Sequence, residues 1–319
     1  MLGEGEAMQE PIRVSIVLAT NRNSPYLAEA LQSVRDQTYP HWDLLVVDNG
    51  VPDTAQLTDA VGDDPRMSVI RVDATATAGR ARNIGVARTE GALVTILDDD
   101  DVWRTDRLQL HVEVHREHPE APASFSGYWH MDAAGHPFGV DWRSRQTDSA
   151  EMLRGGAETP LGPTLVIRRS AYNAIGGFSP EIPILVDFEL ALRLAMLGDL
   201  RYLDATLVGY RRHDANMTST APANARLRRT AMQMMLDRQV WAAQGRGDTT
   251  VARLLGERRR RFELAQARQC GEEMMRAARG GRIRDAAGDA AWALRRAPSA
   301  FLAHAVRFAL SRLLRTGAA

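Results

Sequence analysis

Residues Ala92–Trp103 read ALVTILDDDDVW, an apolar run followed at once by four consecutive aspartates. The run Ala92–Leu97 is short and rich in β-branched residues, so it predicts a buried strand. Adjacent carboxylates repel one another, and a fold tolerates four of them only in solvent or around a cation. Hard divalent cations prefer carboxylate oxygens and also bind phosphates, so the pattern indicates a metal–diphosphate site. A solvated acidic turn before a helix over Arg104–His115 is the alternative.

The chain before this run alternates between predicted strands and helices. Strands are expected over Val14–Ala19, Trp42–Asp48 and Met67–Val72, and helices over Leu27–Val34, Thr54–Val61 and Arg80–Arg88. Such alternation indicates βαβ units, an α/β fold and a mainly parallel sheet flanked by helices. Ligands of such sheets bind at the carboxyl ends of the strands. Asp48 and the aspartate run both stand at such ends.

The pattern changes after about residue 120. Mixed strands are expected over Phe125–Met131, Pro163–Arg168 and Tyr202–Tyr210, with helices over Ser170–Ile175 and Asp187–Leu197. From residue 221 to the end the chain reads as helical, with a hairpin over Ala265–Ala297 that turns at Gly280 and Gly281. We therefore predict a flexible N-terminus over 1–11, one domain over 12–220 with halves 12–120 and 121–220, and a helical region over 221–319.

Charge is unevenly distributed although the net charge is zero. Residues 1–221 carry 20 arginines and 32 acidic residues, a charge of −12, whereas residues 222–319 carry 20 arginines and 8 acidic residues, a charge of +12. The asymmetry suggests segments with different partners. The single cysteine, Cys270, allows no internal disulfide. With no signal-like N-terminus and no long apolar run, we expect a cytoplasmic protein, and contact with the inner face of the membrane stays open.

Residues 12–220 resemble the family 2 glycosyltransferases, whose fold is called GT-A, a Rossmann-like fold that binds nucleotide-diphospho-sugars. VSIVLATNRNSPYLAEALQSVRDQTYPHWDLLVVDNG resembles the first strand, helix and second strand of that family. AGRARNIGVARTEG resembles the segment before its acidic motif, and LDDDDVW resembles the motif itself. IRRSAYNAIGGFSPEI, LVDFELALRL and YRRHDANMT resemble its acceptor-side block and closing histidine segment. The resemblance implies a GT-A domain with a C-terminal α-helical extension.

The resemblance also implies roles for individual residues. Those expected to bind the nucleotide sugar are Thr20, Asp48, Arg82, Asp98 and Asp99. Asp100 is expected to be the principal ligand of Mn²⁺ or Mg²⁺, with His213 completing the metal or diphosphate site. Asp187 is expected to be the general base that takes the proton of the acceptor hydroxyl.

Each of these residues also has a plain structural interpretation. Arg82 would serve equally to pair with an acid, Asp187 to lie at a helix N-terminus, and His213 to lie on the surface. The chain departs from the family pattern at Val186, where an acid is common, and at Asn21 and Asn49 near the nucleobase. His111, His115 and His118 are interpreted as structural.

The implied reaction is an inverting, metal-dependent transfer of a sugar from a nucleotide-diphosphate sugar, most often a UDP-sugar, to an acceptor hydroxyl. The acceptor would be a glycan, a lipid-linked molecule or a small molecule. A single addition is expected, because no Q-x-x-R-W sequence and no membrane spans of the kind found in processive synthases occur. The alternatives are an inactive sugar-nucleotide-binding or scaffold protein with this fold, and a nucleotidyltransferase, which should show a glycine-rich, lysine-bearing phosphate loop.

The basic C-terminal region has its own candidate partners. Residues 299–314 place eight apolar side chains on one helical face: Phe301, Leu302, Ala305, Val306, Ala309, Leu310, Leu313 and Leu314. Packing on the catalytic domain or on a second subunit as a homodimer is one interpretation, and peripheral contact with an anionic membrane surface is the other. Nucleic acid is not expected, because the region lacks interleaved aromatic residues and any recognised module.

Overall fold

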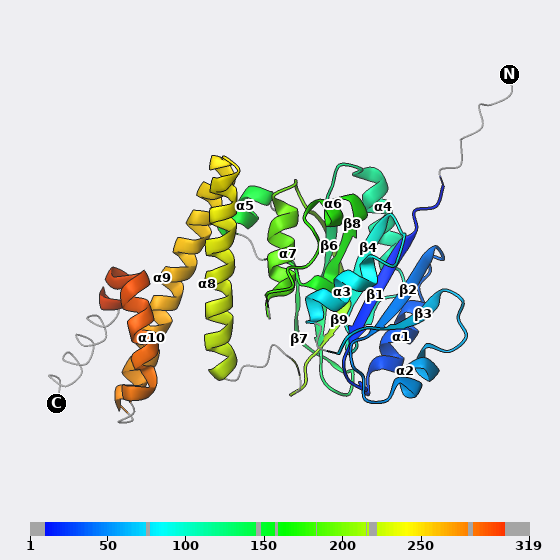
Figure 1. The fold of residues 1–319 in the computed structure, drawn as a ribbon, viewed down its shortest axis with the longest axis horizontal. Helices are drawn as coiled ribbons and strands as arrows, with labels where there is room; N and C mark the ends of the chain where they lie inside the picture. Colours follow the sequence, from blue (N-terminus) through cyan, green and yellow to red (C-terminus); the bar gives the residue numbers. More distant parts are fainter. Residues whose placement is uncertain are drawn as a thin grey trace, which may run out of the picture. The chain divides into compact units, whose positions relative to one another are not determined.

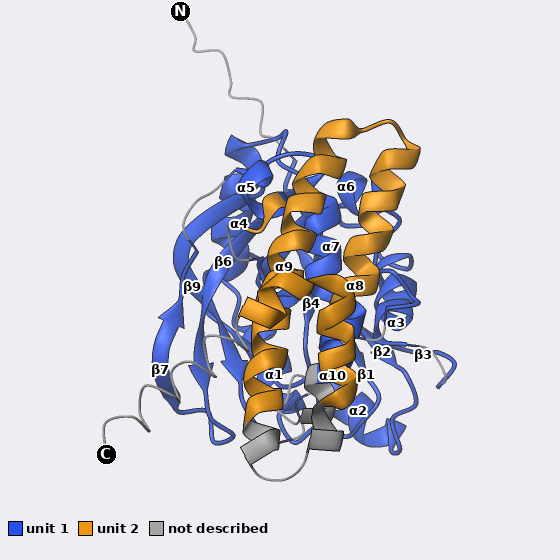
Figure 2. Cartoon of the chain, turned by 90° about the vertical axis from the view of Figure 1, so that its left-hand side faces the viewer, with its two compact units in different colours: residues 1–153, 157–231 blue, residues 154–156, 232–319 orange. Residues whose placement is uncertain are grey.

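A computed structural model describes residues 10–74, 77–144, 148–156, 159–182, 184–214, 216, 222–279 and 283–303. The expected flexible N-terminus therefore lies almost wholly outside the described residues. Within them, the chain divides into two compact units. Unit 1 comprises residues 1–153 and 157–231, and unit 2 comprises residues 154–156 and 232–319 (Figure 2). The division falls inside a long helix, later than the boundary at residue 220 expected from composition.

The first half of unit 1 is the predicted run of βαβ units (Figure 1). Strands β1 (Val14–Thr20), β2 (Trp42–Asp48), β3 (Met67–Arg71) and β4 (Leu93–Leu97) are parallel and lie in the order β3-β2-β1-β4. Helices α1 (Leu27–Arg35), α2 (Thr54–Val61) and α3 (Ala78–Val86) connect them. Thr20 pairs with Asp48, and Leu18 pairs with Leu97. The carboxyl ends of β1, β2 and β4 therefore meet at one edge of the sheet.

The second half of unit 1 extends the same sheet with strands of both directions. Its elements are β5 (Val102–Trp103), α4 (Arg107–Glu117), β6 (Ala123–Met131), β7 (Pro137–Trp142), α5 (Ser149–Arg154), the 3₁₀ turn η1 (Gly162–Thr164), β8 (Leu165–Arg168), α6 (Arg169–Ala174), α7 (Val186–Ala195) and β9 (Arg201–Arg211). Strand β8 is antiparallel to β4 and β6, β9 is parallel to β6, and β5 is antiparallel to β9. Within the described residues the result is a nine-stranded mixed sheet, which agrees with the expected α/β fold.

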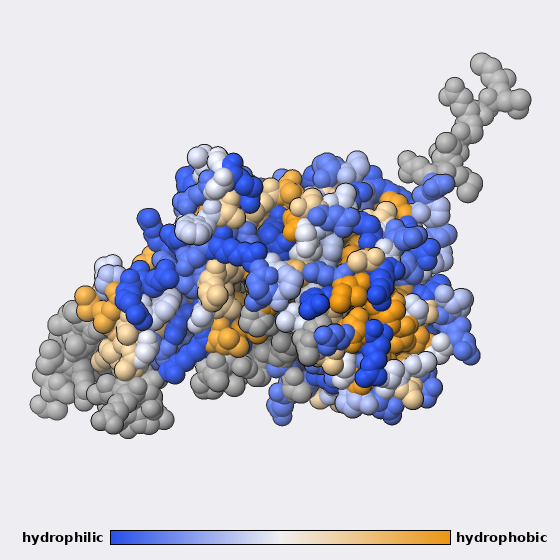
Figure 3. All heavy atoms as spheres, in the orientation of Figure 1, coloured by the Kyte–Doolittle hydropathy of each residue, from blue (hydrophilic) through white to orange (hydrophobic). Residues whose placement is uncertain are grey.

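Burial explains why these segments form strands and helices. The apolar residues of β4 and, apart from Ala19, those of β1 are buried, and α1 contributes Leu27, Ala30, Leu31 and Val34 to the same core. Helix α3 lies close to the sheet because Gly85 has no side chain, and a Cβ there would stand 2.5 Å from Cγ1 of Val17. Edge strand β3 is only partly buried, and apolar residues gather over β1–β3 on the face drawn in Figure 3.

Helices make up the described part of the C-terminal region, as predicted. They are α8 (Pro222–Gly245), α9 (Thr249–Arg279) and α10 (Ile283–Arg296). Unit 2 has a core of its own around Ala267, Cys270, Ala293, Ala297 and Phe301. Helices α9 and α10 thus form the expected hairpin, while its turn at Gly280 and Gly281 lies outside the described residues. Most of the amphipathic stretch over 299–314 lies outside them too.

None of the helices in the described ranges combines the length and the apolar character that crossing a bilayer requires.

Candidate active site

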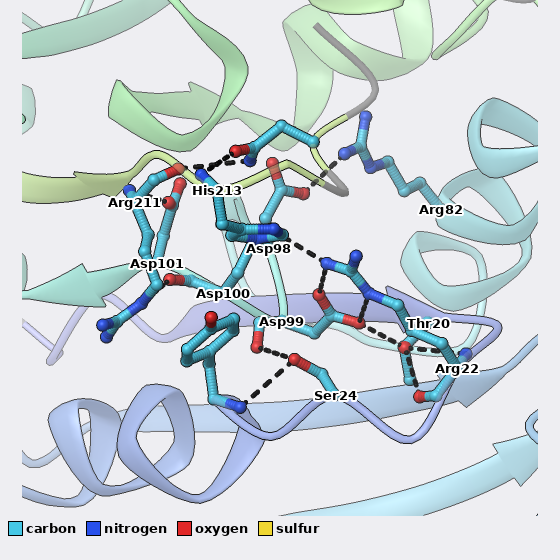
Figure 4. A network of polar contacts seen from close by, with 12 residues as sticks. Thr20, Arg22, Ser24, Arg82, Asp98, Asp99, Asp100, Asp101, Arg211 and His213 are labelled. Atoms are coloured by element: carbon cyan, nitrogen blue, oxygen red, sulfur yellow. Dashed lines mark hydrogen bonds and ion pairs between the residues drawn. The ribbon is translucent and has the colours of Figure 1, made fainter. Parts of the chain in front are cut away.

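The four aspartates lie at the edge of the sheet where β4 ends, next to the end of β1 (Figure 4). The loop after β1 approaches them first. The hydroxyl of Thr20 donates to Oδ2 of Asp99, and the hydroxyl of Ser24 donates to the carbonyl of Asp99 over 3.0 Å. Asp99 is 6% exposed, so these bonds are made away from bulk water. The structure therefore brings together Thr20 and Asp99, two of the residues expected to bind the nucleotide sugar.

Arg22 lies beside them, although no sequence motif singles it out. Its Nε donates to Oδ2 of Asp99 over 3.2 Å, and its Nη2 donates to Oδ1 over 2.6 Å. The same Nη2 lies 2.9 Å from Oδ2 of Asp100. These partners are separated from Arg22 by 77 and 78 residues in the chain, so no local pattern predicts the contact. One guanidinium thus bridges two of the four aspartates.

Asp100 also contacts His213, as the sequence predicts for a shared site. Nε2 of His213 lies 3.0 Å from Oδ2 of Asp100, and both side chains are 10% exposed. The ring of His213 packs against Tyr26 at a centroid distance of 5.1 Å. Desolvation and the neighbouring carboxylates of Asp98 and Asp99 raise the pKa of Asp100 above its ordinary value. A cation at this carboxylate would offset that repulsion.

Arg82 joins Asp98 to the expected general base. Its Nη2 lies 2.6 Å from Oδ1 of Asp98, and its Nη1 lies 3.0 Å from Oδ1 of Asp187. Arg82 is 8% exposed and lies over the ring of Phe178. The plain interpretation of Arg82 as the partner of an acid is thus confirmed, and one of those acids is Asp187. The expected contact of Arg82 with a nucleotide stays a prediction.

Asp187 lies in the first turn of α7, behind a residue with unusual backbone geometry. Leu185 has φ 62° and ψ 25°, in the left-handed region that an L-residue with a large side chain rarely adopts. The carboxyl of Asp187 fits against Gly162, where a Cβ would stand 2.4 Å from Cγ of Asp187. Desolvation raises the pKa of Asp187 and Asp98 acts in the same direction, while Arg82 and the N–H of Gly162 oppose them. A raised pKa suits a general base.

Asp101 links the aspartate run to β9. It is fully buried, its Oδ1 accepts a hydrogen bond of 3.0 Å from the backbone N–H of Arg211, and its Oδ2 has no partner within the described part of the chain. Desolvation and repulsion from Asp98 and Asp100 raise its pKa well above the ordinary value. The side chain of Arg211 donates to the carbonyl of Asp100 over 2.9 Å and pairs with Glu29. Arg211 therefore holds in place the segment between β4 and β5.

Asp48 is occupied by its own loop. Its Oδ1 accepts from the N–H groups of Gly50 and Val51 over 2.9 and 2.7 Å, and its Oδ2 accepts from the hydroxyl of Thr54. Desolvation opposes ionisation, but these bonds outweigh it and lower the pKa of Asp48. Asp48 is 0% exposed, so the structure places it as the organiser of the loop after β2. Its expected contact with the nucleoside stays a prediction.

The site holds more acidic than basic side chains. The acidic ones are Asp98, Asp99, Asp100, Asp101, Asp187 and Glu29, and the basic ones are Arg22, Arg82 and Arg211. No group of three or more histidine, cysteine or carboxylate side chains in the described ranges encloses a metal ion by itself. Divalent ions at nucleotide sites commonly take one or two protein ligands and complete their shell with phosphate oxygens and water. Asp100 and His213 fit such an ion.

A sequence model of "Glycosyl transferase family 2" matches residues 15–176, about half of the chain. The chain belongs to this family. Its relatives include the putative teichuronic acid biosynthesis glycosyltransferase TuaG of Bacillus subtilis, 33% identical over 39% of this chain and 50% of TuaG. Glycosyltransferase GlyG of Streptococcus pneumoniae is 26% identical over 65% of this chain and 73% of GlyG. The chain thus spans about half the length of TuaG, and glycosyl transfer is the class of reaction that its family carries out.

Solved structures share the fold. TarS of S. aureus, residues 1–349 in complex with UDP-GlcNAc, superposes with a TM-score of 0.58 at 15% identity, covering 87% of this chain and 90% of TarS 1–349. The complex of the same protein with UDP gives a TM-score of 0.55 at 18% identity, over 72% of this chain and 65% of that one. At these identities the likeness establishes the fold, which is the GT-A architecture expected from the sequence.

Proposed function

We propose that this chain transfers a sugar from a UDP-sugar to an acceptor hydroxyl, one sugar at a time and with inversion at the anomeric carbon. One observation carries the proposal: Arg82 joins Asp187 to Asp98, at 3.0 and 2.6 Å, so that a carboxylate from α7 lies beside the aspartates that end β4. A displacement needs a base on the acceptor side and charge stabilisation on the donor side. Both kinds of group meet at this edge of the sheet.

The donor side would use the residues around the ends of β1 and β4. Thr20, Asp98, Asp99 and Arg82 would bind the nucleoside diphosphate, with Asp48 shaping the loop beneath it. The UDP and UDP-GlcNAc complexes of TarS support a uridine donor. Asp100 and His213 would hold Mn²⁺ or Mg²⁺, which supplies a Lewis acid that stabilises the charge on the departing diphosphate.

The acceptor side would use Asp187. The acceptor oxygen forms a bond to the anomeric carbon as the bond from that carbon to the diphosphate oxygen breaks, and the proton of the hydroxyl passes to Asp187. The electron pair of the broken bond leaves on the nucleoside diphosphate. Because the nucleophile enters opposite the leaving group, the configuration inverts. Arg82 keeps the carboxyl group of Asp187 oriented. It also favours the ionised form of that group, since the guanidinium lowers the pKa that desolvation raises.

The names of the relatives suggest a glycan or a lipid-linked sugar as acceptor. One of them, WfgD of Escherichia coli, is named for transfer of glucose from UDP-Glc to a GlcNAc-diphosphoundecaprenol and is 27% identical over 32% of this chain and 40% of WfgD. We propose an acceptor of this class, used at the cytoplasmic face of a membrane. Membrane contact or a homodimer through the C-terminal helices, both expected from the basic region, stay predictions.

Thermal unfolding of the purified chain with UDP, TDP or GDP, each with and without Mn²⁺, tests the donor site. We expect a rise of the unfolding temperature that needs Mn²⁺, is largest for UDP, and is absent in Asp100→Ala. Asp204→Asn is the matched control, because Asp204 is 78% exposed and pairs only with Arg143 among the ion pairs of the described chain. No shift with any nucleotide would refute the proposal and favour a scaffold protein that keeps the fold.

A further inference from the structure

Arg22 differs from Arg82 and Arg211 because it contacts the side-chain carboxylate of Asp100, the expected metal ligand. Two of its N–H groups are fixed on Asp99, and the second N–H of Nη2 points to Oδ2 of Asp100 at 2.9 Å. Nη1 makes no hydrogen bond with the described residues. The side chain is 37% exposed, in contrast to the 10% of Arg82. The two N–H groups of Nη1 are thus left without a hydrogen-bond partner among the described residues, on a side chain that is partly exposed.

The oxygen that Arg22 contacts is also the one that faces His213. Nε2 of His213 lies 3.0 Å from the same Oδ2 of Asp100. Adjacent ligands that are each about 2.1 Å from an octahedral ion stand about 3 Å apart. The pair Oδ2 and Nε2 therefore has the spacing of two neighbouring ligands of one small divalent ion. A guanidinium nitrogen 2.9 Å from that oxygen would be repelled by an ion bound there, so the two cations weaken each other's hold on Oδ2.

We propose that Arg22 competes with the metal ion for Asp100 and moves its free N–H groups onto the diphosphate when metal and donor bind together. The proposal rests on the metal–diphosphate function given above. A planar guanidinium fits a phosphate with paired N–H bonds, and Asp99 keeps its stem in place, so only the tip has to turn. Without a diphosphate the guanidinium of Arg22 has no new partner when the ion displaces it from Asp100. The metal ion alone therefore binds weakly.

The consequence is that metal and nucleotide strengthen each other's binding. UDP should raise the affinity for Mn²⁺, and by linkage Mn²⁺ should raise the affinity for UDP by the same factor. A nucleotide sugar then enters a site that the ion does not occupy by itself. We assign this mutual enhancement to Arg22, because Arg82 and Arg211 hold other carboxylates or backbone carbonyls.

Isothermal titration calorimetry with Mn²⁺, in the absence and presence of UDP, tests the competition. In Arg22→Gln we expect Mn²⁺ alone to bind roughly tenfold tighter, UDP with Mn²⁺ to bind more weakly, and the mutual enhancement to shrink by roughly tenfold or more. Arg22→Lys keeps the charge but has one compact donor group, so it should fall between the two. Unchanged or weaker binding of Mn²⁺ alone in both variants would overturn the proposal.

Two further variants separate this result from failure of the proposed function. Arg13→Gln removes an exposed arginine that pairs with Asp43 at the other end of β1, and it should bind Mn²⁺ and UDP as the unaltered chain does. Asp100→Ala should lose Mn²⁺ binding with and without UDP. If the unaltered chain itself binds no Mn²⁺ with UDP, the metal–diphosphate function fails and the competition with it. If Asp100→Ala abolishes binding but Arg22→Gln changes nothing, only the competition fails.

Discussion

Arg82 sets the ionisation of the proposed base, because its guanidinium lies 3.0 Å from Asp187 while desolvation and Asp98 favour the protonated acid. The pKa of Asp187 is raised even with Arg82 present. A base acts only when ionised, so its contribution is lost as pH falls through that pKa. Removal of Arg82 takes away an effect that lowers the pKa, and the loss should then begin at higher pH.

We therefore expect Arg82→Gln to move the acidic limb of the pH–rate profile to higher pH. The measurement is kcat against pH at saturating donor, so that weaker donor binding does not enter. Arg22→Gln is the comparison, because in the part of the chain that the structure describes Arg22 contacts Asp99 and Asp100 but not Asp187. An acidic limb at the same pH in Arg82→Gln and the unaltered chain would contradict the assignment of Asp187 as base.

A second prediction concerns Asp187 alone. Asp187→Asn keeps the shape that fits against Gly162 but removes the proton acceptor. Transfer should fall by a factor of about 10² to 10⁴, the range typical of general base catalysis, while the Mn²⁺-dependent shift with UDP persists. Donor hydrolysis and transfer are measured separately, each beside Asp204→Asn. Loss of the UDP shift together with activity would instead place Asp187 in the donor site.

At the scale of elements, helix α4 carries two histidines into the core, as their interpretation as structural residues predicts. His111 is fully buried and His115 is 1% exposed. Nδ1 of His111 lies 2.7 Å from the hydroxyl of Ser124, and Nε2 of His115 lies 3.1 Å from the carbonyl of Val166. Desolvation lowers the pKa of His115 to about 4 and that of His111 well below its ordinary value. Both rings are neutral in the folded protein at neutral pH.

Stability should therefore fall as the solution is acidified. Below about pH 6.5 the unfolded chain protonates both histidines while the folded chain does not, so acid favours unfolding. For His115 the loss continues until about pH 4 and reaches about 3 kcal/mol. Carboxyls with raised pKa, such as Asp100 and Asp101, act in the opposite direction. Urea unfolding between these limits is the measurement, and a weaker pH dependence in His115→Gln is expected; an equal dependence in both proteins would contradict it.

Strands and helices could be predicted from the sequence where burial produces a continuous or periodic run of apolar residues. Strands β1, β2 and β4 are largely buried runs rich in apolar residues, and their predicted ranges agree with the structure to within a residue. Strand β7 is exposed along nearly its whole length, so it leaves no apolar pattern, and the two residues of β5 form a strand only because Val102 pairs with Gly209 of β9. Tertiary pairing decides both.

The site shows the same limit. Asp98, Asp100, Asp187 and His213 could be named because each stands in a motif of the family, and the structure brings them together. Arg22 and Arg211 were not named, although both lie in segments that resemble the family, because their partners stand 78 and 110 residues away and no local pattern indicates those contacts. An arginine in a loop has many potential partners, and the fold selects one.

At the scale of the whole molecule, unit 2 has ion pairs and an apolar core of its own. The basic region looks unpaired in the sequence, yet in unit 2 Asp237 pairs with Arg259 and Arg296, and Glu263 lies 3.6 Å from Arg296. These pairs join α8, α9 and α10 through one acidic centre. Partly exposed pairs contribute little stability each, so the small apolar core around Cys270 and Phe301 must supply most of it.

Because unit 2 has its own core, we predict that its stability can be lowered without loss of the donor site. Phe301 is 4% exposed in the core of unit 2, and truncation of a buried phenylalanine costs about 3–5 kcal/mol. In Phe301→Ala we expect calorimetry to show one unfolding transition at a lower temperature, while a second keeps its temperature and its rise with UDP and Mn²⁺. Leu302→Ala, at a side chain that is 52% exposed, is the matched control and should leave both transitions in place. If Phe301→Ala abolished the UDP response, the donor site would depend on unit 2, and the core of unit 1 would not suffice to form it.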